Sequence, residues 1–408
     1  MKLAAAFLGM LGAAAAFFAT LGALAAPSAA SSEPTAASVS APAAMRFEFA
    51  TKPFVDLHFY VRSLAASKAP RPEIAEVEGL AEAVQAARDL DAELGSPLAW
   101  GYVEGLLGDC GSAHEGTLAM ARTRKTVEML GARNIELRTG AMKLAAALEK
   151  AEPAFLEKVW PAHKKAIEEA RERITKGFDG KEGACLADVA KHLGLPSAER
   201  AIPVRLVYEE PFPGAVTHRK PGGGGVCFVS VKGVLGTELL ESVLHEATHA
   251  LDVLGRPAPG EEKPRESASE KSADKDPEEG SDGGTEKPPK KASEEPAEPV
   301  DERAVENPEV SVLDLLRARL ERAGFSRRDP EWRNVPHTLM FVQAGETIRR
   351  IVDPKHEHYG VTAKYYDKVR AIADVELAAW TAYLDGKTTR EEAMEKILST
   401  VRDAKSPR

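Results

Sequence analysis

Apolar residues recur every three or four positions through most of the chain, which is the spacing of one face of an α-helix. Clusters of Gly, Pro and Asp separate these stretches, as is usual at helix ends. The pattern predicts helices at 73–94, 118–130, 141–148, 153–174, 310–323, 336–352, 362–384 and 389–401. Pro336 fits the first turn of its helix, where proline is favoured. The chain is therefore expected to be mainly helical.

Two short segments have the texture of β-strands instead. In 202–208, Val204, Leu206 and Tyr208 alternate with other residues, and 226–231 is an apolar run entered through four glycines. Both patterns are typical of strands. The glycine run lacks the Lys-Ser/Thr ending of a phosphate-binding loop. We therefore expect an α+β fold, mainly helical, with a small sheet.

The amino terminus has the features of an export signal. Lys2 precedes the apolar stretch 3–24, and Ala23 and Ala25 supply the small residues of a signal-peptidase site. We expect a signal peptide at 1–25, a disordered spacer behind it to residue 44, and a periplasmic or secreted protein with no stable membrane insertion after cleavage. An uncleaved membrane anchor is the alternative, because the run is long enough to span a bilayer.

The composition changes again in 256–309, which is rich in Glu, Lys, Pro and Ser and poor in large apolar residues. Such a segment cannot bury enough surface to fold, so a disordered insertion is expected. Residues 261–310 carry a net charge of −9, which equals that of the whole chain. The remainder is formally neutral, which argues against a nucleic-acid partner.

The insertion divides the rest of the chain into segments with different textures. They are a helical N-terminal lobe at 45–200, a strand pair with one helix at 201–255, and a helical C-terminal part at 310–405. Because helical sequence flanks the insertion on both sides, it is expected to be a long surface loop within one domain.

The strongest chemical signal is the sequence His-Glu-Ala-Thr-His at 245–249, within a predicted helix over 236–255. A separation of four residues places His245 and His249 on one helix face, as two ligands of a tetrahedral Zn²⁺ require. Glu246 is rotated by about 100° from His245. It is therefore placed to act as general base toward a metal-activated water.

A strand followed by a helix with His-Glu-x-x-His resembles the zincin superfamily of metallopeptidases, over roughly 202–255. The resemblance implies peptide-bond hydrolysis at zinc, with Glu246 as base and then as acid. It also implies a substrate peptide along an edge strand, for which 226–231 is the candidate. The metzincin subclass is disfavoured, because Asp252 and Gly255 stand where its pattern has Gly and His or Asp.

The gluzincin subclass takes its third ligand from a glutamate on a later helix, and Glu346 fits that description. A carboxylate in so apolar a helix is costly unless it is paired or metal-bound, and Gly345 allows close helix approach. A salt bridge to Arg349 or Arg350 is the other explanation. His337 is the rival ligand; it lies nine residues earlier, on the opposite helix face, so both cannot bind one ion. Glu346 completes the predicted zinc site.

Further polar residues after the insertion are candidates for stabilising an oxyanion; they are His356, His358, Tyr359, Tyr365 and Tyr366. Asp252 is placed to accept the second ring hydrogen of a ligating histidine. The three cysteines allow one disulfide with one thiol left over, in any of three pairings.

These patterns together predict an exported zinc metallopeptidase that acts on a peptide or protein. Two other interpretations stay open. One is an exported zinc-binding protein without catalytic activity, which a filled cleft mouth would favour. The other is a helical periplasmic binding or scaffold protein with a coincidental motif, which widely separated ligands would favour.

Overall fold

The computed structural model describes residues 45–254 and 310–405, apart from short gaps at 96, 123–125, 130–132, 198–199, 212–213, 221–222 and 235. The described residues all belong to one compact unit, Ala43–Arg408. The predicted signal peptide at 1–25, the spacer at 26–44 and the insertion at 256–309 lie outside the described residues.

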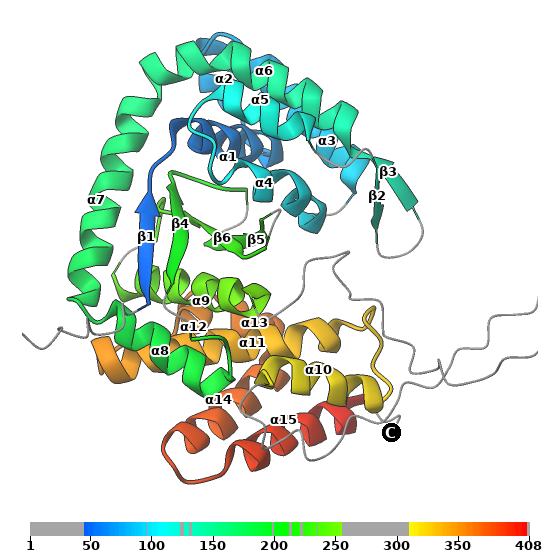
Figure 1. Ribbon diagram of the computed structural model, residues 1–408, viewed down its shortest axis with the longest axis vertical. Coiled ribbons are helices and arrows are strands. Elements are labelled where there is room, and N and C mark those ends of the chain that lie inside the picture. Colours follow the sequence, from blue (N-terminus) through cyan, green and yellow to red (C-terminus); the bar gives the residue numbers. More distant parts are fainter. Residues whose placement is uncertain are drawn as a thin grey trace, which may run out of the picture. The chain divides into compact units, whose positions relative to one another are not determined.

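Within the described residues the main sheet has the strand order β1-β4-β6-β5 (Figure 1). Its strands are β1 (Arg46–Ala50), β4 (Ala201–Val207), β5 (Ala215–Arg219) and β6 (Gly225–Ser230). The first three in spatial order are parallel, and β5 runs antiparallel to β6. The two predicted strands are confirmed as β4 and β6. The short β1 and β5 escaped the periodicity, because each is only five residues long.

The expectation that 226–231 forms the edge strand is wrong. β6 pairs with β4 on one side and with β5 on the other, and every one of its residues is buried. A continuous apolar run is typical of a strand that is covered on both faces. The edge strand next to β6 is β5, whose residues are all half-buried.

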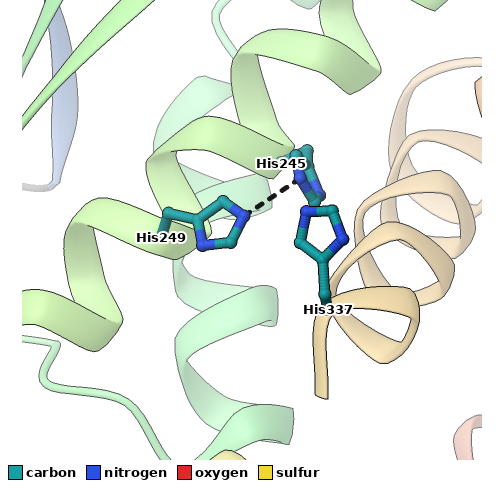
Figure 2. A group of neighbouring side chains, drawn as sticks. All are labelled: His245, His249 and His337. Atoms are coloured by element: carbon teal, nitrogen blue, oxygen red, sulfur yellow. Dashed lines mark hydrogen bonds between the residues drawn. The ribbon is translucent and has the colours of Figure 1, made fainter. Parts of the chain in front are cut away.

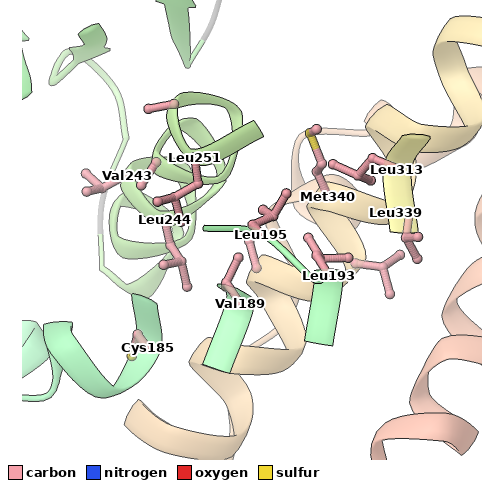
Figure 3. Close-up of a cluster of buried hydrophobic side chains, with 14 of the residues drawn as sticks. Cys185, Val189, Leu193, Leu195, Val243, Leu244, Leu251, Leu313, Leu339 and Met340 are labelled. Atoms are coloured by element: carbon pink, nitrogen blue, oxygen red, sulfur yellow. The ribbon is translucent and has the colours of Figure 1, made fainter. Parts of the chain in front are cut away.

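The helix α9 (Thr237–Leu254) packs on one face of this sheet and α1 (Pro53–Ala66) on the other. Alternate residues of β6 explain the division: Cys227 belongs to the core with α9, whereas Phe228 packs with α1. The core around α9 also contains side chains from α8 (Glu182–Leu193), α10 (Val312–Arg322) and α11 (Pro330–Thr347), several of which Figure 3 shows.

A second buried cluster lies among the N-terminal helices. The elements of this region are α1, α2 (Glu73–Glu76), α3 (Leu80–Leu94), η1 (Pro97–Trp100), α4 (Gly101–Leu107), α5 (Ala113–Ala121), α6 (Leu137–Lys158) and α7 (Trp160–Phe178). The helix expected at 118–130 is wrong in its second half, because the short hairpin of β2 (Thr126–Met129) and β3 (Arg133–Glu136) follows α5. Pro153 does not begin a helix but lies inside α6.

The C-terminal part continues with α11, the π-turn η3 (Ile348–Val352), α12 (Tyr359–Thr362), α13 (Tyr365–Lys368), α14 (Arg370–Leu384) and α15 (Arg390–Lys405). Pro336 lies inside α11 and not at its start, because Pro330 already occupies the first turn behind Asp329. The mainly helical α+β fold is confirmed.

All three cysteines are described, and each is a buried free thiol, so the disulfide that the sequence allowed is not formed. Burial raises the pKa of the Cys110 thiol to about 11. Among the described helices, none combines the length and the apolar character needed to cross a membrane.

Candidate metal centre

The helix α9 presents two histidines on one side while its apolar side enters the core. Leu244 and Leu251 are buried in that core, and His245 and His249 lie one turn apart on the face toward α11 (Figure 2). His245 is only 2% exposed. The two Nε2 atoms are 3.1 Å apart. The predicted pairing of these two side chains is thus present in the structure.

His337 of α11 completes the group. One ring nitrogen from each of the three histidines lies within 4.8 Å of the others, and they are the one such group of potential ligands among the described residues (Figure 2). The His337 ring centroid is 5.1 Å from that of His245 and 5.1 Å from that of His249. His337, which was the rival candidate to Glu346 for the third ligand, is therefore the residue that lies beside His245 and His249.

The group fits a zinc ion in geometry and in charge. Two nitrogens bound at about 2.05 Å to a tetrahedral zinc lie about 3.3 Å apart, close to the 3.1 Å between His245 and His249. Burial and the neighbouring imidazoles hold the pKa of His245 well below its usual range. Burial and His249 lower the pKa of His337 to about 3. Neutral imidazoles are the form that binds a metal.

Aromatic residues contact the rings of His245 and His337. The Tyr365 hydroxyl lies 2.9 Å from Nδ1 of His337, which leaves Nε2 of that ring for the group. Phe341 stacks on His245 with ring centroids 3.6 Å apart, and Tyr365 contacts Phe341 in turn at 4.8 Å. Tyr365 was a candidate for oxyanion stabilisation, but its hydroxyl is directed to the third histidine.

Glu246 lies between the histidine group and the edge strand. Its Oε1 is 3.8 Å from Nε2 of His245, and its Oε2 accepts a hydrogen bond of 2.7 Å from the Thr217 hydroxyl of β5. Burial raises the pKa of Glu246 to about 8, although the bond from Thr217 lowers it. Glu246 is only 4% exposed, so its carboxyl is largely shielded from solvent.

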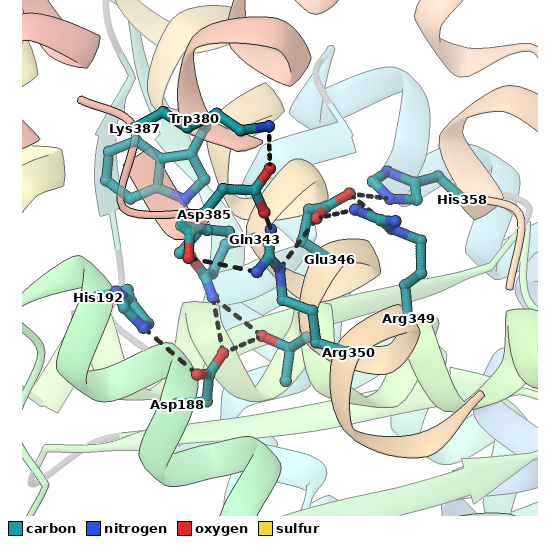
Figure 4. Close-up of polar contacts among 12 residues, drawn as sticks. Asp188, His192, Gln343, Glu346, Arg349, Arg350, His358, Trp380, Asp385 and Lys387 are labelled. Atoms are coloured by element: carbon teal, nitrogen blue, oxygen red, sulfur yellow. Dashed lines mark hydrogen bonds and ion pairs between the residues drawn. The ribbon is translucent and has the colours of Figure 1, made fainter. Parts of the chain in front are cut away.

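Glu346, the expected third ligand, does not belong to the group. Its carboxylate is bound by Arg349 at 2.6 Å, by Arg350 at 3.1 Å and by His358 at 3.2 Å (Figure 4). Burial raises its pKa, but the bonds from His358 and Arg349 outweigh burial and lower it to about 2. The structure thus gives Glu346 the salt bridges that were the alternative explanation. Gly345 makes room for the His358 ring, since a Cβ there would lie 2.7 Å from it.

The remaining candidates mostly have structural partners. His356 binds Glu241 of α9 at 2.6 Å, and Asp252 pairs with Arg317 at 3.3 Å. Tyr359 differs: a Cβ at Gly214, just before β5, would lie 3.4 Å from its hydroxyl. Tyr359 therefore lies at the start of the edge strand.

A buried charged cluster, which the sequence pattern did not predict, lies on the side of β5 away from Glu246. Glu104 of α4 is bound by Arg62, by His58 at 3.1 Å and by His218 of β5 at 2.6 Å. His58, Glu104 and His218 come from α1, α4 and β5, three segments that lie far apart in the sequence. Because no short-range pattern relates these segments, the sequence carries no signal that brings the three side chains together. The cluster attaches α4 to the edge strand, where a Cβ at Gly105 would overlap a backbone oxygen of β5.

No family model, no curated protein and no solved structure matches this chain.

Proposed function

We propose that this chain is an exported zinc-dependent peptidase whose metal ligands are His245, His249 and His337. The observation that carries the proposal is the group of three imidazoles with Glu246 directly beside it. Three protein ligands with one open position is the usual arrangement of a catalytic zinc. Export rests on the amino-terminal sequence, which lies outside the described residues.

The proposed reaction is hydrolysis of a peptide bond. A zinc ion bound by the three imidazoles would supply Lewis acidity to the scissile carbonyl and to the attacking water. Glu246 takes a proton from that water and returns it to the leaving amine. The Thr217 hydroxyl holds Oε2 of Glu246, which leaves Oε1 on the side of His245 for the proton.

The edge strand supports a peptide substrate. Within the described residues β5 has β6 on one side and no strand on the other, so its outer backbone groups are able to pair with an extended peptide. α4 packs against His218 and Arg219 at the end of β5. The substrate is therefore expected along the first residues of the strand, 215–217, which include the partner of Glu246.

A non-catalytic zinc-binding protein is the second candidate, and burial favours it. Glu246 is 4% exposed, His245 is 2% exposed, and Phe341 covers the His245 ring. Hydrolysis requires that a substrate reach these groups. No observation supports the third candidate, a binding or scaffold protein with a coincidental motif. If the motif were coincidental, we would expect the other candidate ligands to lie far from His245 and His249, whereas His337 lies beside them.

Zinc content of the purified protein, measured by elemental analysis, tests the ligand set. About one zinc per chain is expected in the wild type, with loss in His249→Ala and His337→Ala and retention in Glu346→Gln. Zinc that persists in His337→Ala but disappears from Glu346→Gln would refute the assignment of His337.

Hydrolysis of a peptide library by the zinc-loaded protein then separates the two candidates. Glu246→Gln is expected to keep its zinc and to lose at least about 100-fold in rate, as removal of a general base does. If the zinc-loaded wild type cleaves no peptide and is as inactive as Glu246→Gln, the peptidase proposal fails and the non-catalytic zinc-binding protein is the function that remains.

A further inference from the structure

The fold pairs most of its buried carboxylates with cations. Glu104 has Arg62 and two histidines, and Glu346 has two arginines and a histidine. Glu209 is bound by Lys232 and by Arg71, the latter at 3.0 Å. This is the expected pattern, because a buried carboxylate without a partner is strongly destabilising.

Glu210, the next residue, is an exception. Glu210 is 9% exposed, and among the described residues its Oε1 has no hydrogen-bond partner and no cation is paired with it. Burial raises the pKa of Glu210 well above its usual range, and the charges of Glu246 and Glu104 raise it further. Arg62 acts in the opposite direction, but its guanidinium is already bound to Glu104.

The position of Glu210 connects this exception to the proposed active site. It lies in the connection from β4 to β5, four residues before Gly214, and the start of the edge strand follows. Its carboxyl is within electrostatic range of both Glu246 and Tyr359. Tyr359 itself reaches Gly214. Glu210 and Glu246 therefore belong to the same surroundings at the beginning of β5.

We propose that Glu210 binds a positively charged group of the substrate, either its free amino terminus or a lysine or arginine side chain. The inference rests on the proposed peptidase function and specifies the class of peptide. A buried carboxyl that has no cation partner among the described residues favours a cation from outside. A metal ion is not the expected occupant, because Glu210 belongs to no group of three potential ligands among the described residues.

The unpaired carboxyl of Glu210 also predicts how its replacement changes the thermal stability of the protein without a substrate. Glu210→Gln removes an unpaired buried carboxyl, so the thermal midpoint of the zinc-loaded protein is expected to stay equal or to rise. Glu209→Gln is the matched control from the same connection. It breaks an existing pair, so its midpoint is expected to fall. A fall for Glu210→Gln as large as that for Glu209→Gln would show a structural role and overturn the proposal.

Cleavage of defined octapeptides by the zinc-loaded proteins tests recognition. Each peptide carries arginine or its neutral isostere citrulline at one position, with a free or acetylated amino terminus. The wild type is expected to prefer a cation at one fixed place by at least about tenfold in kcat/KM. Glu210→Gln loses that preference, and Glu209→Gln keeps it. The acetylated series identifies the amino terminus as the source, and the citrulline series the side chain.

The outcomes separate this inference from the proposed function. Cleavage by the wild type without any preference for a cation would refute the role of Glu210 and leave the peptidase standing. If zinc-loaded wild type cleaves none of the peptides, the peptidase proposal fails. Calorimetric binding of the same octapeptides then decides: cation-dependent binding that Glu210→Gln abolishes supports the subsite, and absence of such binding refutes it.

Discussion

Replacing Tyr365 by phenylalanine removes one hydroxyl from behind the third histidine and little else. The ring remains to pack against Phe341, which it contacts at a centroid distance of 4.8 Å. What is lost is the bond of 2.9 Å to Nδ1 of His337. With a metal on Nε2, Nδ1 must carry the proton, and it then has no acceptor in a nearly dry site.

The size of the effect follows from the cost of that unmet donor. A buried polar group without its partner costs about 1–3 kcal/mol. In the metal-free protein the ring is able to adopt the other tautomer or turn, so most of this cost applies to the metal-bound form. Since about 1.4 kcal/mol corresponds to a factor of ten, zinc affinity is expected to fall about 10- to 100-fold, the usual range for such outer partners.

The assay is competition for zinc against a chelator with a spectroscopic signal, at one fixed pH. Tyr383→Phe is the matched control, because that hydroxyl bonds Nδ1 of His192 at 3.1 Å, and neither residue belongs to the histidine group. Tyr383→Phe is expected to bind zinc like the wild type. Affinity of Tyr365→Phe within twofold of this control would refute the reasoning.

Three further predictions concern stability. Gly105→Ala places a Cβ 2.2 Å from the carbonyl oxygen of Arg219, so α4 must shift from β5, and chemical denaturation should show a loss of about 1–3 kcal/mol; an unchanged midpoint would contradict this packing. The pKa of Glu346, lowered to about 2 against an ordinary 4.5, contributes stability that is fully present above about pH 4.5 and is lost as pH falls toward 2. The advantage of the wild type over Glu346→Gln, on the order of 3 kcal/mol, should therefore shrink on acidification, and an advantage that does not vary with pH would exclude the ion pair as its source. Burial raises the pKa of Glu376 well above its usual range, so its cost grows as pH rises above 4.5, and Glu376→Gln should gain on the wild type between pH 5 and 8 in unfolding titrations.

The local sequence was sufficient to predict the central helix α9 and the two strands β4 and β6. The periodicity of α9 and the four-residue spacing of His245 and His249 fix both imidazoles on one face, whatever surrounds the helix. The alternation in β4 and the apolar run of β6 are likewise properties of the segments themselves. These elements were predicted because their patterns are repeated within a few residues of chain.

The edge of the sheet and the third histidine were decided by packing between distant segments. Which strand lies outermost depends on pairing order, and β5 carries too few residues for its pattern to be recognised. His337 and Glu346 both lie on α11, separated by nine residues or about 13.5 Å of helix. Each has a plausible reason to be a ligand in the sequence alone.

The sequence by itself determined the pair of histidines, the glutamate adjacent to the first of them and the helical class, because these follow from spacing along one chain segment. Only the tertiary structure decided that His337 lies at the pair, that Glu346 is held by Arg349 and Arg350, and that Glu210 has no cation partner in the part of the chain that the structure describes. The physical reason is that the partner of a side chain depends on how distant helices and strands pack against one another. The same packing decides which charged groups are left without a partner. Neither quantity is encoded in local periodicity.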